Sequence, residues 1–181
     1  MKIFVMSDIH GSSYFLKKAI EAYEREKATY ILILGDELYH GPRNPLPLEY
    51  NPKEVADILN NYKDKIIAVR GNCDSEVDQM MLQYPMLGDY STIFLKEKRI
   101  FVTHGHIYSE DKLPNMSIGD VFIYGHTHLP VAYEKDGIYR LNPGSISLPK
   151  GGNVNSYGIL EESYFCVKSL DGEIIKEIEI K

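Results

Sequence analysis

The chain has 181 residues, which suits one domain with a substantial hydrophobic core, and we expect residues 1–181 to form a single domain. Apolar residues make up 44% and charged residues 25%, as is ordinary for a soluble globular protein. The formal net charge of -6, without a long lysine or arginine run, argues against binding to a nucleic-acid backbone or to an anionic membrane.

The two cysteines, Cys73 and Cys166, do not form a CxxC motif, so a disulfide framework is not expected and a reducing compartment fits. The first apolar run is too short for a signal peptide or a membrane span. We therefore expect a cytoplasmic protein.

The first apolar run, residues 3–6, has the length of a strand that is buried on both faces. Asp8, His10 and Gly11 follow it, at the edge of the sheet where ligands bind in open α/β folds. A carboxylate and an imidazole two residues apart on a tight turn can converge on one cation. Taken alone, the motif fits a helix cap at Asp8 about equally well.

Four more apolar runs end in the same way, in Asp, Asn or His with glycine close by. They cover residues 30–34 before Gly35-Asp36, 65–69 before Arg70-Gly71-Asn72, 99–103 before His104-Gly105-His106, and 120–124 before Gly125-His126-Thr127-His128. This repetition favours a shared ligand site over helix capping.

Helical and strand-like segments alternate in the first part of the chain. A helix is expected after Ser12 or Ser13, because apolar residues recur on one face through Tyr23, and it would complete a parallel βαβ unit. Residues 37–51 are rich in proline and predict an irregular loop, which is either a wall of the substrate site or a plain surface loop. A second helix is expected to begin at Asn51.

Strand patterns dominate the second part of the chain. A short helix is expected after Ser75, with Met80 and Met81 as core side chains. A hairpin with a charged tip at residues 96–99 follows, and strands are expected at residues 131–133, 138–141, 164–170 and 174–180. Helices early and strands late favour two layers of sheet with helices outside them.

The polar side chains at the strand ends form a mixed set of oxygen and nitrogen donors without a thiolate. Such a set suits Mn²⁺, Fe²⁺ or Zn²⁺, and it is too large for one catalytic ion but about right for two with a bridging carboxylate. Two ions can clamp a phosphoryl group and ionise a water between them. The candidates are Asp8, His10, Asp36, Asn72, His104, His126 and His128.

The ordered motifs Asp8-x-His10, Gly35-Asp36, Gly71-Asn72, His104-Gly105-His106 and Gly125-His126-x-His128 resemble the signature of the calcineurin-like metallophosphoesterases. Residues 41–44, 71–80, 142–145 and 150–153 further resemble the YfcE-type phosphodiesterases, so the resemblance covers nearly the whole chain. It implies an α/β fold, a four-layer α/β/β/α sandwich of two mixed sheets flanked by helices, with a dimetal site at the strand ends.

The resemblance also implies roles for the candidate ligands. Asp8, His10 and His128 would hold one ion, Asn72, His104 and His126 the other, and Asp36 would bridge them. The ions are expected to be Mn²⁺, with Zn²⁺, Fe²⁺ or Ni²⁺ as alternatives. The implied activity is hydrolysis of small phosphodiesters by a metal-bound hydroxide in line with the leaving group, in a homo-oligomer such as a dimer or tetramer.

Cys73 is a departure from most of this superfamily, which has histidine after the Gly-Asn pair; the YfcE-type branch has cysteine there. Its thiol is either a weak acid for the leaving group or a small packing side chain, and we expect a preference for diesters with good leaving groups. His40 and His106 are alternative donors or structural histidines. Arg43 is the expected contact for substrate phosphate, whereas Arg70 could equally form a salt bridge.

The sequence is also compatible with two other functions. The chain could be a phosphomonoesterase or nuclease of the same superfamily, although its acidic balance weighs against the nuclease. It could also be a scaffold, because a subunit of the vacuolar sorting complex has this fold and serves chiefly as an interaction module. Such scaffolds lose ligand histidines, whereas all seven ligand positions are intact here.

Overall fold

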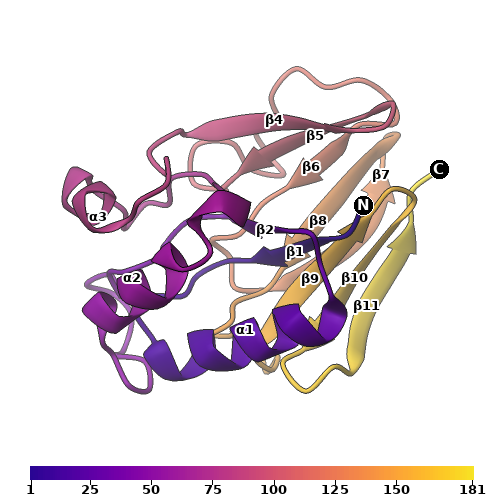
Figure 1. Cartoon of the computed structure of the whole chain (residues 1–181). Helices are drawn as coiled ribbons and strands as arrows, with labels where there is room; N and C mark the ends of the chain where they lie inside the picture. The colour runs from indigo at the N-terminus through magenta and orange to yellow at the C-terminus, as the bar shows by residue number, and fades with distance from the viewer.

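The computed structural model describes residues 1–181 and contains two mixed β-sheets that pack face to face (Figure 1). The first sheet has the order β11-β10-β9-β1-β2-β3, in which β1, β2 and β3 are parallel and β9 to β11 antiparallel. Its strands are β1 (Ile3–Met6), β2 (Tyr30–Ile33), β3 (Ile66–Ala68), β9 (Ser156–Glu161), β10 (Tyr164–Ser169) and β11 (Ile174–Glu179).

The second sheet has the order β4-β5-β6-β8-β7, with β5, β6 and β8 parallel and the two edge strands antiparallel. Its strands are β4 (Tyr90–Leu95), β5 (Lys98–Thr103), β6 (Val121–Ile123), β7 (Pro130–Lys135) and β8 (Ile138–Pro143). The expected α/β fold with two mixed sheets is confirmed.

Helices α1 (Ser13–Glu26) and α2 (Pro52–Asn60) cover the outer face of the first sheet, and a 3₁₀ turn (Lys63–Lys65) leads into β3 (Figure 1). Both helices begin with the expected caps: the Ser12 hydroxyl accepts from Phe15 N–H, and the Asn51 side chain accepts from Glu54 N–H. No helix of the chain is both long enough and apolar enough to cross a membrane.

Each central strand buries side chains on both of its faces. In β1, Ile3 and Val5 pack into the core between the two sheets, while Phe4 and Met6 pack against α1 and α2. Both faces of the strand are therefore apolar, which is why the sequence shows continuous apolar runs rather than alternation.

A loop covers the outer face of the second sheet. The four-layer sandwich expected from the sequence has helices on this face. Phe101, Phe122 and Tyr124 form a third core cluster there, packed by Tyr108 and Met116 from the loop at residues 105–119. This loop forms no helix, and no helix follows α3 (Glu76–Met81) in the chain.

Two local expectations were wrong. Met80 and Met81 of α3 are not core side chains, since they are 83% and 42% exposed. Strand β9 was not predicted at all, although it pairs with β1 in the middle of the first sheet. Gly158 interrupts its apolar pattern, and the structure uses that glycine to make room for the ring of Phe165.

Candidate metal centre and substrate pocket

The backbone at the strand ends adopts an unusual conformation. Asp8, His10, Asp36, His126 and His128 all have positive φ angles, between 50° and 65°. A left-handed backbone costs a non-glycine residue free energy, so such residues persist where the surroundings hold them and cluster at functional sites. The left-handed turns direct side chains from three separate loops toward one place.

Asp8, His10 and His128 form the first cluster, with ligand atoms within 4.8 Å of one another. The Oδ1 atom of Asp8 lies 3.6 Å from Nε2 of His10 and 3.2 Å from Nε2 of His128. The Nδ1–H groups of the two histidines donate to the carbonyls of Tyr39 and Leu148. In the neutral imidazole, Nε2 is therefore left with a lone pair directed into the cluster.

A second cluster lies beside the first and comprises Asn72, His104 and His126. Nε2 of His104 is 3.4 Å from Oδ2 of Asp36, 3.1 Å from Oδ1 of Asn72 and 3.2 Å from Nδ1 of His126. Nδ1–H of His104 donates to the Leu34 carbonyl at 2.6 Å. An acceptor thus orients the ring of His104, whereas His126 turns Nδ1 toward the site and has no such partner.

Asp36 stands between the two clusters. Its Oδ2 atom is 3.7 Å from Nε2 of His10 and 3.4 Å from Nε2 of His104, while its Oδ1 accepts from the Cys73 N–H. Its carboxylate therefore faces a histidine of each cluster. Asp8 also reaches both clusters, because it groups with Asp36 and His104 as well as with His10 and His128.

The arrangement fits divalent cations. Nε2 of His10, Nε2 of His128 and Oδ1 of Asp8 are all hydrogen-bond acceptors, and Oδ1 is buried without a donor. Three acceptors that face one another in a buried site repel unless a cation or protons lie among them. Imidazole nitrogens, carboxylates and an amide oxygen suit first-row divalent metals.

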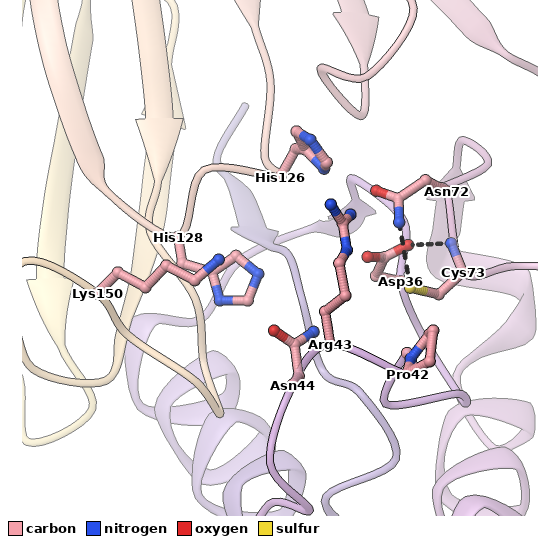
Figure 2. Close-up of a pocket in the computed structure, with 10 residues that line it drawn as sticks. Asp36, Pro42, Arg43, Asn44, Asn72, Cys73, His126, His128 and Lys150 are labelled. Carbon is pink, nitrogen blue, oxygen red and sulfur yellow. Dashed lines mark hydrogen bonds between the residues drawn. The ribbon is translucent and has the colours of Figure 1, made fainter.

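A pocket of about 350 Å³ opens over the clusters and is lined by ten residues, only one of them hydrophobic. Figure 2 shows the Arg43 side chain extending into this pocket among Asn72, His126 and His128, with Lys150 on its other side. The positive charges of Arg43 and Lys150, close to side chains of the types that bind metals, make this pocket suitable for an anion. Arg43, from the proline-rich loop, thus forms part of the pocket wall.

Residues 1–164 match the model of the calcineurin-like phosphoesterase superfamily domain. The chain belongs to this superfamily. The resemblance noted in the sequence is thereby confirmed.

Known members of the superfamily resemble the chain over most of its length. It is 48% identical over 181 residues to phosphodiesterase YfcE of Escherichia coli K12, which covers 99% of this chain and 98% of that protein. It is 30% identical over 151 residues to phosphodiesterase MJ0936 of Methanocaldococcus jannaschii, covering 80% and 83%. A solved structure of E. coli YfcE, described as a phosphoesterase, superposes with a TM-score of 0.98 at 47% identity, covering 100% of both chains.

The electrostatics of the superfamily site depend on its carboxylates. Burial alone would lower the pKa of His104, but the hydrogen bond to Asp36 and the charges of Asp8 and Asp36 raise it to about 9. Burial would likewise raise the pKa of Asp8, and hydrogen bonds with His10 and His128 hold it well below its usual range. The metal-free site therefore favours a protonated His104 beside ionised carboxylates.

Asp74 is a positioning residue that the sequence reasoning missed. Its carboxylate accepts the backbone N–H groups of Asp36, Glu37 and Gly71 at 2.8, 2.9 and 2.7 Å. It thereby ties the turn that carries Asp36 to the turn that carries Asn72. Its place two residues after Asn72, in a motif that was already recognised, was the available signal.

Two serines perform a similar task for Asp8. The hydroxyls of Ser145 and Ser147 both donate to the Asp8 carbonyl, at 2.9 and 2.8 Å. The left-handed turn at Asp8 is thus held by a loop from the far end of the chain. Lys150, in the following turn, was also missed as a pocket residue, because only the fold brings that turn to the site.

Cys73 lines the pocket beside Asn72, whose Nδ2 lies 3.2 Å from the thiol sulfur. Burial raises the pKa of the Cys73 thiol, and the charge of Asp36 adds to that effect. The thiol therefore holds its proton at neutral pH and is a weak acid. Gly41 packs against it, since a Cβ at Gly41 would lie 2.8 Å from the sulfur.

The remaining candidates, Arg70, His40 and His106, do not line the pocket. Arg70 forms a salt bridge with Asp89, with Nε 2.9 Å from Oδ1. His40 packs edge-on against Tyr50 and is not part of the pocket wall. The ring of His106 lies 5.4 Å from that of His104, and burial with the neighbouring histidines lowers its pKa to about 4.

Proposed function

We propose that this protein is a metal-dependent phosphodiesterase that hydrolyses small phosphodiesters with two divalent ions, Mn²⁺ first among them. The observation that carries the proposal is the pair of ligand clusters joined at Asp36. The first cluster offers three mutually facing acceptors, and Asp36 lies 3.7 Å from His10 in the first cluster and 3.4 Å from His104 in the second. YfcE and MJ0936, both named phosphodiesterases, support the choice of reaction.

The proposed ligands keep the roles assigned from the sequence. Asp8, His10 and His128 would hold one ion, Asn72, His104 and His126 would hold the other, and Asp36 would contribute to both. When bound there, the two ions supply positive charge to the phosphoryl oxygens and make water acidic enough to act as a nucleophile at neutral pH.

The chain itself holds the substrate. Arg43 and Lys150 extend over the clusters, so each can pair with a non-bridging phosphate oxygen of a diester (Figure 2). Arg43 comes from the loop between β2 and α2, whereas Lys150 comes from the loop between β8 and β9. A diester bound between them would be oriented with respect to both clusters and would displace water from the pocket.

The environment of Cys73 sets the preferred leaving group. A protonated thiol of raised pKa is a poor proton donor, so little assistance is available to a departing alkoxide. Diesters of acidic alcohols, such as nitrophenol, need little assistance. We therefore expect them to be hydrolysed faster than dialkyl esters.

Hydrolysis of a nitrophenyl phosphodiester and of the matching monoester tests the proposal. Metal-stripped protein is titrated with Mn²⁺, Zn²⁺ and Mg²⁺, beside Asp36→Asn and the control Asp57→Asn on the exposed side of α2. Removing residues that merely support a ligand costs 10–100-fold, so Asp36→Asn is expected to lose at least about 100-fold. Asp57→Asn should match the wild type.

Each alternative predicts a different outcome. Preference for the monoester would indicate a phosphomonoesterase, and cleavage of an oligonucleotide in place of the small diester would indicate a nuclease. A metal-loaded protein without any turnover would favour the scaffold.

Three further expectations remain predictions. The single domain of residues 1–181 accords with a core that runs continuously between the sheets. A cytoplasmic location accords with Cys73 and Cys166 both being free thiols. A dimer or tetramer is checked by light scattering of the metal-loaded protein.

A further inference from the structure

A second hollow adjoins the metal pocket. It is a groove of about 620 Å³ lined by α3, the start of α2 and the loop after Asp36. Six of its twelve lining residues are hydrophobic, compared with one of ten in the metal pocket. Tyr39, Tyr50, Val77 and Met81 are among them. The groove is thus suited to an apolar group rather than to a second anion.

The groove and the metal pocket share two wall residues. Asn72 and Cys73 line both of them. In Figure 2 these two residues lie next to Asp36, on one side of the pocket. A substituent on a phosphate that is bound at the clusters can therefore pass Cys73 and reach the groove.

Three of the apolar side chains that line the groove are exposed to solvent. Val77 is 67% exposed, Met81 42% and Tyr39 41%, although all three are large and hydrophobic. Val77 and Met81 lie four residues apart on α3 and so share one face of the helix. Figure 1 shows α3 projecting beyond the strand ends, away from both sheets.

The two acids of the groove are already paired. Asp74 accepts backbone N–H groups from the turns at Asp36 and Gly71, and Asp78 accepts the N–H and hydroxyl of Ser75. Because these carboxylates already have donors within the protein, an apolar group in the groove would not deprive them of hydrogen bonds. Lys53 is its one cationic wall residue.

We propose that this groove is the subsite for an aromatic or other apolar ester group of the substrate. The inference rests on the proposed function and narrows it: the preferred substrates are phosphodiesters with at least one aryl or bulky apolar ester. The phosphate lies under Arg43 and Lys150, and the apolar group lies past Cys73, against Val77 and Met81.

Two phosphonates that differ only in one organic group test the subsite. Phenylphosphonate and methylphosphonate are titrated into the Mn²⁺-loaded protein by calorimetry, so that binding is read without turnover. Each buried methylene contributes about 0.8 kcal/mol, or roughly fourfold in affinity. A partly buried phenyl ring should therefore bind at least about tenfold more tightly than methyl.

Variants of α3 locate the preference. In Val77→Ser/Met81→Ser the advantage of phenyl over methyl should fall to about twofold or less, since two side chains lose their contacts. Met80→Ser is the matched control: Met80 is on the same helix and 83% exposed, but it does not line the groove. All three residues are exposed to solvent, so thermal melts should match the wild type.

Equal affinity for the two phosphonates in the wild type would overturn the proposal. So would a phenyl preference that survives in Val77→Ser/Met81→Ser as it does in Met80→Ser, or failure of phenylphosphonate to bind. The proposed function fails separately, if the metal-loaded wild type binds phenylphosphonate in the groove but does not hydrolyse a nitrophenyl phosphodiester.

Discussion

The Nε2 atoms of His10 and His128 lie 3.4 Å apart, and in the neutral imidazoles each faces the other with a lone pair. The protons of both rings are held on Nδ1 by backbone carbonyls from distant loops, those of Tyr39 and Leu148. The fold therefore fixes the tautomer of each ring before any ion binds. Only a cation or an added proton relieves the contact, so metal and protons compete for this site.

Protonation of His104, in the second cluster, predicts how the stability of the metal-free protein depends on pH. Burial would lower the pKa of His104, but Asp36 and Asp8 raise it to about 9 from an unfolded value near 6.5. A raised folded-state pKa stabilises the protein fully below pH 6.5, and this contribution is lost as pH rises toward 9. We expect the urea midpoint of the metal-free protein to fall across this window.

The Mn²⁺-loaded protein is the control for that measurement, because an ion in place of the protons removes their contribution. Its urea midpoint should rise or stay level between pH 6.5 and 9, as the ligands lose their competing protons. A metal-free midpoint that does not change across the window would contradict the assignment of the proton to His104.

Arg43→Ala should weaken substrate binding more than the chemical step. The guanidinium lies in the pocket above the clusters and is not a metal ligand. Loss of a charge-assisted contact costs about 1.5–3 kcal/mol, which corresponds to roughly 10–100-fold in kcat/KM, expressed mainly in KM. Steady-state kinetics with a nitrophenyl phosphodiester measures the effect.

Arg70→Ala is the matched control for Arg43→Ala, since Arg70 is paired with Asp89 and lies outside the pocket. Its KM should be close to that of the wild type. Equal losses in the two arginine variants would show that the effect is one of overall charge.

Cys73→His should extend the range of leaving groups. Burial and the charge of Asp36 raise the pKa of the Cys73 thiol, so it is a weak donor, whereas an imidazole at the same position can protonate a departing alkoxide. We expect a gain of roughly 10²-fold for an alkyl leaving group and little change for nitrophenol. Metal content, measured in parallel, should be unchanged. If Cys73→His hydrolysed each of the two esters at the wild-type rate, the proposed effect of Cys73 on the leaving group would be wrong.

The strand ends were predictable from the sequence because each buried run is followed directly by its polar residues. Runs that are apolar on both faces belong to central strands, and the chemistry-bearing residues follow them in the same turn. Asp36 and His104 could be identified in this way. Their neighbours in space come from other loops, but the ligand types alone were sufficient to propose a shared site.

Other features could not be predicted because they depend on contacts between distant segments. Lys150 reaches the pocket only because the loop between β8 and β9 folds over Asp8, where Ser145 and Ser147 bind its carbonyl. Met80 and Met81 are exposed because α3 lies beyond the sheets. The position of this helix cannot be predicted from the hydrophobicity of its residues.

Gly35→Ala should destabilise the protein far more than Gly152→Ala, although both glycines have positive φ angles, +92° and +76°. A Cβ at Gly35 would lie 2.4 Å from the backbone nitrogen of Gly71, so the two turns that carry Asp36 and Asn72 would have to separate. A Cβ at Gly152 meets nothing within 4 Å. We expect a loss of about 3 kcal/mol or more at Gly35, from strain plus overpacking, and of about 1 kcal/mol at Gly152 from the backbone alone. Urea unfolding of the metal-free proteins measures both values, and similar losses would show that the close approach of the two turns is not what positions the ligands.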